Sequence, residues 1–194
     1  MKLLFSVVLV LGVNALMSQT HNTGSISQDK RYHQLVEIIN KNTGSAHMTR
    51  GMNSHTIDAL KDSTTAKDIP VLEKMLKDPD NIVVMTTVNV LMGMGKEGRK
   101  AIYETCINST DEKYLHSITD QLYSNANTNE VSTWKEDVPL LMKMTEKNNF
   151  EVINIGVNFL SMIGEDGKKI LTDIYNKTSN PTTKLLIKEK LMIH

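Results

Sequence analysis

The chain has 194 residues, a formal net charge of zero and one cysteine, which excludes an internal disulfide. Apolar residues make up 40% and aromatic residues only 5%, which favours packed helices over a β-sandwich or barrel. The sequence has no basic stripe. Together with the neutral net charge, this argues against a nucleic-acid-binding protein and against electrostatic docking on an anionic membrane.

The N-terminus has the pattern of a secretory signal peptide. A lysine follows the first methionine, residues 3–13 are apolar, and small residues precede a cleavage point after Ala15 or after Ser18. This apolar stretch is too short to span a bilayer, although it also suits a buried N-terminal strand or helix. We therefore predict an exported protein, periplasmic or secreted, with a signal peptide at 1–15 and a disordered, polar lead-in at 16–28.

The rest of the chain repeats itself. With an offset of 69, residues 68–102 align with residues 137–171 without a gap. A shorter period of 31, with one step of 38, separates five leucines: Leu60, Leu91, Leu122, Leu160 and Leu191. The long step contains a polar insertion at 124–134, which we predict to be an enlarged loop.

Apolar spacing and capping residues predict two helices in each repeat. Asp68 is a predicted N-cap with Pro70 in the first turn, and Asp111 and Pro181 mark later helix starts. The predicted helices span 29–41, 53–62, 68–77, 82–93, 97–107, 111–123, 136–147, 150–162, 167–177 and 181–193. Such hairpins bury their apolar sides only by stacking, so we predict an all-α fold, an α-solenoid of about five stacked helical hairpins over residues 29–194.

A glycine motif at 93–98, Gly-Met-Gly-Lys-Glu-Gly, matches the G-x-G-x-x-G pattern of a dinucleotide-binding loop. That loop needs a preceding strand and an acidic residue on the next strand, whereas 111–123 is predicted as a helix. The second copy, at 162–167, replaces the first glycine with methionine. We therefore interpret the motif as a turn between helices, with Gly95 left-handed and Gly98 allowing close approach.

The sequences D-I-P-V-L, L-K-D-P-D-N-I-V-V and V-L-M-G-M-G, within 68–95, resemble the HEAT-like repeat of the phycobilin-lyase type, and 137–164 resembles it as well. The resemblance implies an α-solenoid of short hairpins, with structural motifs and no catalytic residues to transfer. Thr87 and Gly156 stand where that family usually has alanine, and both are small enough to preserve close helix contact.

The sequence shows no catalytic or metal-ligating constellation. Its six histidines form neither H-x-x-x-H nor H-E-x-x-H, so we expect no metal and no cofactor. Cys106 suits a small core position; a catalytic thiol would need a partner such as His33 or His116. The sequons at Asn108 and Asn176 matter only for a protein secreted through an endoplasmic reticulum.

The helix predicted at 82–93 is apolar on nearly all sides. It is either central and covered, or it presents a methionine-bearing stripe to a partner. On the second interpretation, the concave face formed by the second helices binds another protein, with contacts from Met85, Val88, Asn89, Met92, Asn154 and Asn158. The apolar C-terminus at 185–193 leaves little room for a polar capping face, and it either folds back or docks on a partner or on itself.

The predicted function is therefore protein binding or scaffolding outside the cytoplasm. Two alternatives from other classes stay open. One is a lyase-like enzyme, or a non-catalytic subunit, related to the chromophore lyases that share this repeat type. The other is a nucleic-acid-binding HEAT-like solenoid similar to DNA glycosylases, which the neutral charge and the signal peptide oppose.

Overall fold

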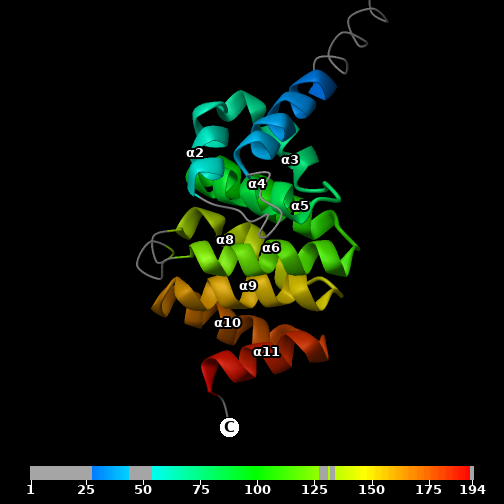
Figure 1. Ribbon diagram of the computed structural model, residues 1–194. Helices are drawn as coiled ribbons and strands as arrows, with labels where there is room; N and C mark the ends of the chain where they lie inside the picture. The colour runs from blue at the N-terminus through cyan, green and yellow to red at the C-terminus, as the bar shows by residue number, and fades with distance from the viewer. Residues whose placement is uncertain (1–27, 44–53, 127–130, 132–133, 193–194) are drawn as a thin grey trace, which may run out of the picture.

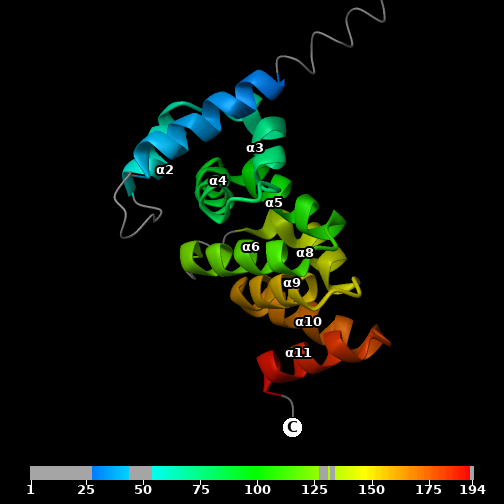
Figure 2. The same cartoon turned by 45° about the vertical axis from the view of Figure 1, so that its right-hand side comes forward.

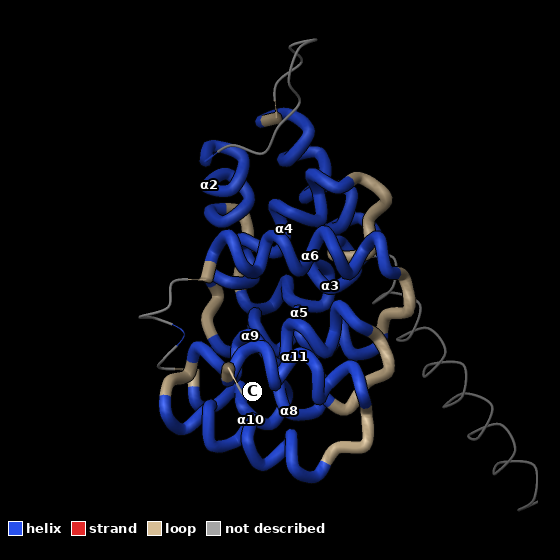
Figure 3. Tube along the Cα trace, turned by 90° about the horizontal axis from the view of Figure 1, so that it is seen from below, coloured by secondary structure: helices blue, strands red, loops and turns tan. Residues whose placement is uncertain are grey.

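The computed structural model describes residues 28–43, 54–126, 131 and 134–192. Within these residues all regular structure is helical and none is strand (Figure 1, Figure 3), so the predicted all-α class is confirmed. The predicted helices also match the observed ones to within a few residues at each end. The predicted signal peptide, and the lead-in up to residue 27, lie outside the described residues.

The helices follow one another in pairs. The first described helix spans 28–42. After it come α2 (Ser54–Asp62), α3 (Ile69–Met75), α4 (Asn81–Gly93), α5 (Lys96–Asn108), α6 (Glu112–Asn125), α8 (Val138–Thr145), α9 (Phe150–Met162), α10 (Glu165–Lys177) and α11 (Pro181–Leu191). One-turn 3-10 helices, η1 (Ala66–Asp68) and η2 (Lys135–Asp137), precede α3 and α8.

In chain order, the helix at 28–42 pairs with α2, α3 with α4, α5 with α6, α8 with α9, and α10 with α11. The second helix of each pair packs against the second helix of the next pair. In this row α2 contacts α4, α4 contacts α6, α6 contacts α9, and α9 contacts α11. The first helices form a shorter row in which α3 contacts α5 and α5 contacts α8. The colour changes steadily from blue to red along the molecule in two views (Figure 1, Figure 2), so order in the sequence is order in space.

Short polar side chains begin the second helices of the pairs. Asp80, Asp111, Asn149 and Asn180 each accept a hydrogen bond from a backbone N–H in the first turn of the following helix. These bonds satisfy donors that have no partner inside the helix. The predicted starts at Asp111 and Pro181 are confirmed.

Asp68 occupies the N-cap position of α3, with Pro70 in the first turn, as predicted, but its side chain does not cap the helix. Its side chain makes no cap hydrogen bond to α3, because η1 comes first and Thr65 caps that turn instead. The Asp68 carboxylate accepts a hydrogen bond from Nε of Arg31 at 2.7 Å. Asp137, the matching residue of the second copy, accepts one from Nε of Arg99 at 2.5 Å. The repeated aspartate therefore joins its hairpin to an arginine of an earlier helix.

The Arg31–Asp68 pair predicts a pH dependence of stability. The hydrogen bond from Arg31 lowers the pKa of Asp68, so the carboxylate stabilises the fold above its unfolded pKa, about 4, and the effect is lost as pH falls below it. We expect D68N to be less stable than the wild type near neutral pH and the difference to shrink below about pH 4. Urea titrations at both pH values measure this; a constant difference would contradict the ion pair.

The glycine motif forms the turn between α4 and α5, as predicted. Gly95 has φ 70° and its counterpart Gly164 has φ 82°, a region that side-chain-bearing residues rarely adopt. A Cβ on Gly98 would lie 1.9 Å from the carbonyl oxygen of Leu91, so the two helices touch there through bare backbone. Because α4 rather than a strand precedes this turn, it lacks the context of a dinucleotide-binding loop.

An aromatic cluster fills the core between the third and fourth hairpins. Trp134 and Tyr123 stack on Phe159, with ring centroids 5.9 and 5.8 Å away, and Tyr103 meets the same ring edge-on. Trp134 is 4% exposed and Val131 is buried. The insertion at 124–134 is therefore not a wholly polar loop, since its last apolar residues belong to the core.

Candidate partner-binding face

The repeated leucines define equivalent surface positions on the second helices. Leu60, Leu91, Leu122 and Leu160 are 0% exposed, and each belongs to a second helix. Three positions (six before, two before and one after each leucine) define what we call the second-helix face. These positions are Ser54, Asp58 and Lys61; Met85, Asn89 and Met92; His116, Asp120 and Tyr123; Asn154, Asn158 and Ser161; Leu185, Glu189 and Met192. Every one of them is at least partly exposed.

On α4, the structure separates the predicted contact residues. Met85, Asn89 and Met92 are half-buried and lie on the second-helix face. Val88 is 0% exposed, so its predicted role as a partner contact is wrong. It points into the core because α2, α3, α5 and α6 all pack around α4. The helix is thus central and covered, as one of the two interpretations predicted, except for the stripe formed by Met85, Asn89 and Met92.

On α9, the predicted residues Asn154 and Asn158 form a local network. The amide nitrogen of Asn158 donates to the side-chain oxygen of Asn154 at 2.6 Å and to the hydroxyl of Tyr123 at 2.9 Å. Burial raises the pKa of Tyr123 well above its ordinary value, so the phenol stays neutral. The two asparagines therefore present a half-buried surface held against α6.

On α6, sequence reasoning missed His116. Its Nδ1 lies 3.3 Å from a carboxylate oxygen of Glu151 on α9, and its Nε2 lies 3.4 Å from Asp120. The sequence contained a signal for this position, because His116 follows Met85 by the period of 31 residues that also separates the leucines. It links α6 to α9 at the centre of the second-helix face.

On α11, the structure separates two sides of the apolar C-terminus. Leu186 is 8% and Ile187 0% exposed, and the helix packs on α9 and α10. Leu185 is 57% exposed and Met192 is 80% exposed. Lysines on the remaining surface, Lys184, Lys188 and Lys190, are exposed. The last helix therefore folds back and does have a polar outer side, contrary to our expectation, while two apolar side chains stay uncovered.

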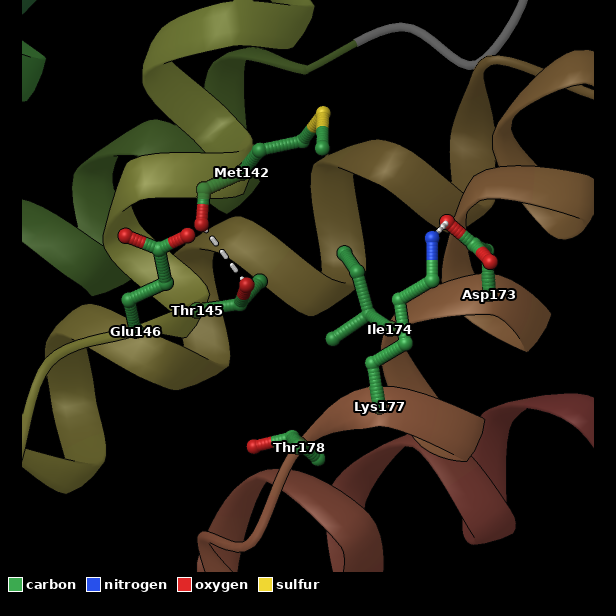
Figure 4. A pocket seen from close by; sticks show the side chains of 7 residues that line it. All are labelled: Met142, Thr145, Glu146, Asp173, Ile174, Lys177 and Thr178. Atoms are coloured by element: carbon green, nitrogen blue, oxygen red, sulfur yellow. Dashed lines mark hydrogen bonds and ion pairs between the residues drawn. The ribbon is translucent and has the colours of Figure 1, made fainter.

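The first helices carry a separate groove between α8 and α10, with a volume of about 280 Å³. Figure 4 shows Met142 and Ile174 on its two walls, with Lys177 turned toward Asp173 on the same helix; that ion pair is 2.6 Å long. Its walls thus combine apolar side chains with hydroxyls, carboxylates and one lysine.

The first copy of the repeat has the same groove between α3 and α5. Its lining residues Glu73 and Glu104 match Met142 and Asp173 at the offset of 69. Burial raises the pKa of Glu73, and the nearby Glu104 adds to this effect. The two copies of the groove therefore differ in chemistry, which argues against one ligand shared by both.

Cys106 lies in the core, as composition suggested. It is 0% exposed, and burial raises the pKa of its thiol to about 12, opposite to the change that a catalytic thiol needs. Because it is the only cysteine, a thiol reagent reports on it alone. We expect Ellman's reagent to react at least about tenfold more slowly with native than with urea-unfolded protein. Equal rates would contradict this burial.

Among the described residues, no three His, Cys, Asp or Glu side chains are grouped to hold a metal ion. No described helix is long and apolar enough to cross a membrane. No family model, curated protein or solved structure matches the chain. The resemblance to HEAT-like repeats thus stays a prediction from the residues quoted above.

Proposed function

We propose that this protein is an exported α-solenoid of HEAT-like hairpins that binds another protein through its second-helix face. The repetition at an offset of 69 and the unbroken row from α2 to α11 support a solenoid. The observation that carries the proposed function is the second-helix face itself. Its positions are all accessible, and large apolar side chains are placed on it at α4 and α11.

The chemistry of this face suits a protein partner. Met85 and Met92 offer adaptable apolar contacts, and the neighbouring amides and carboxylates offer hydrogen bonds, a mixture typical of protein interfaces. Asp58, Asp120 and Glu189 would repel the phosphates of a nucleic acid.

The double variant M85S/M92S tests the proposal. Both side chains are half-buried, so the fold should survive, while partner binding should weaken at least about tenfold through lost apolar contact. The measurement is capture of partners from the native extracytoplasmic fraction, with circular dichroism to check folding. A photo-crosslinker at Asp120 should yield adducts, and one at Lys143 on the opposite row should not. An unchanged set of partners with the double variant would refute the proposal.

A further inference from the structure

The second-helix face is not uniform along the row of helices. Its first apolar group, on α4, consists of Met85 and Met92. Its second, on α11, consists of the equivalent residues Leu185 and Met192, 57% and 80% exposed. The helices between them carry polar side chains at the equivalent positions: His116, Asp120, Tyr123, Asn154, Asn158 and Ser161. Two apolar groups therefore flank a polar centre.

The distance between these groups follows from helix packing. The row runs from α4 through α6 and α9 to α11, so three helix-to-helix steps separate the groups. Packed helices lie about 8–10 Å apart, which places the groups about 24–30 Å apart. An extended peptide advances about 3.3 Å per residue and covers this distance with about eight residues.

The centre of the face is acidic. Asp120 has 66% of its side chain exposed, and Glu151 lies beside it across His116. Glu189 is exposed on α11, between Leu185 and Met192 in the sequence, and no face position on α6, α9 or α11 is a lysine or an arginine. Carboxylates therefore predominate, and they attract Lys or Arg from a partner.

We propose that the second-helix face binds an extended segment of a partner protein that carries two large apolar side chains about eight residues apart, with basic residues between them. This inference rests on the proposed function and names the class of partner. A docked helix needs apolar contact at each turn, whereas this face offers it only at the two ends. An extended segment can donate its main-chain N–H groups to the carboxylates between the anchors.

Labelled synthetic peptides test the spacing. Each carries two leucines about four, eight or twelve residues apart in a Lys/Ser background, and binding to the full mature chain is measured by fluorescence anisotropy. We expect the middle spacing to bind about tenfold more tightly than the others, and glutamate in place of lysine to abolish the binding. The variant L185S should remove the preference for the middle spacing. The variant M142S, in the groove between α8 and α10, should leave this preference intact.

Several results would overturn the inference: equal affinity at all spacings, unchanged binding by L185S, tighter binding of a helical peptide, or a dimer of the chain that L185S dissociates. Crosslinking of a natural partner from Asp120 together with no dependence on spacing would refute the extended-segment inference and leave the proposed function intact. If neither a crosslink from Asp120 nor a dependence on spacing is found, the proposed function and the extended-segment inference are both refuted.

Discussion

Replacing Gly98 with alanine is expected to lower the free energy of unfolding by about 3 kcal/mol or more. The new Cβ would lie 1.9 Å from the carbonyl oxygen of Leu91 and 2.7 Å from its carbon. Both atoms belong to the backbone of α4, so relief requires α4 and α5 to move apart. Urea unfolding followed by circular dichroism measures the loss. Gly167→Ala should lose a similar amount, since its Cβ would lie 1.8 Å from the oxygen of Leu160.

Two neighbouring glycines are matched controls. Gly95→Ala meets no atom within 4 Å, so its expected loss of about 1–3 kcal/mol comes only from its positive φ. Gly93→Ala lies in α4 and meets only the flexible end of Lys61, so it should change stability by less than about 1 kcal/mol. A Gly98→Ala protein as stable as Gly93→Ala would show that α4 and α5 do not touch there.

Local features of the sequence predicted most of the fold. Helix starts were visible at Asp111 and Pro181 because a cap involves only a few adjacent residues. The glycine turn was visible because Gly95 and Gly98 recur at the same spacing in the second copy. These signals come from residues that are close in the sequence, so they can be recognised without knowledge of the tertiary packing.

Contacts between distant residues were not predictable in the same way. Arg99 and Asp137 are 38 residues apart, and no local pattern in the sequence links them. Trp134 was assigned to a polar loop because its neighbours are polar, yet it stacks on Phe159. A single sequence gives no pairing information of this kind, because which surfaces meet depends on how the hairpins are placed in space.

The candidate site was predicted in part. The apolar stripe of α4 was visible from its composition, but its periodicity could not separate the half-buried Met85 from the fully buried Val88, since both are apolar. His116 was missed although it occupies an equivalent position, and Leu185 was considered only as part of the apolar C-terminus. The buried leucines of α2, α4, α6 and α9, seen in the structure, show which side of each of these helices faces the core.

Replacing Asp137 with alanine is expected to lower the free energy of unfolding by about 3 kcal/mol. The variant leaves the Arg99 guanidinium, 6% exposed, without its buried partner and between core residues. Arg99 also lies 4.3 Å above the Trp134 ring and 3.0 Å from Glu136, but Glu136 is 41% exposed and replaces the lost carboxylate only partly. Urea unfolding monitored by circular dichroism and by Trp134 fluorescence measures the loss.

Asp68→Ala is the matched control, because the repeat places the same ion pair in a more exposed setting. The Arg31 side chain is 32% exposed, so water solvates it when Asp68 is removed, and we expect a loss of about 1 kcal/mol or less. The double variant R99M/D137L should lose less than Asp137→Ala, because it leaves no buried charge unpaired. Equal losses from Asp137→Ala and Asp68→Ala would mean that burial does not decide the strength of this repeated link between hairpins.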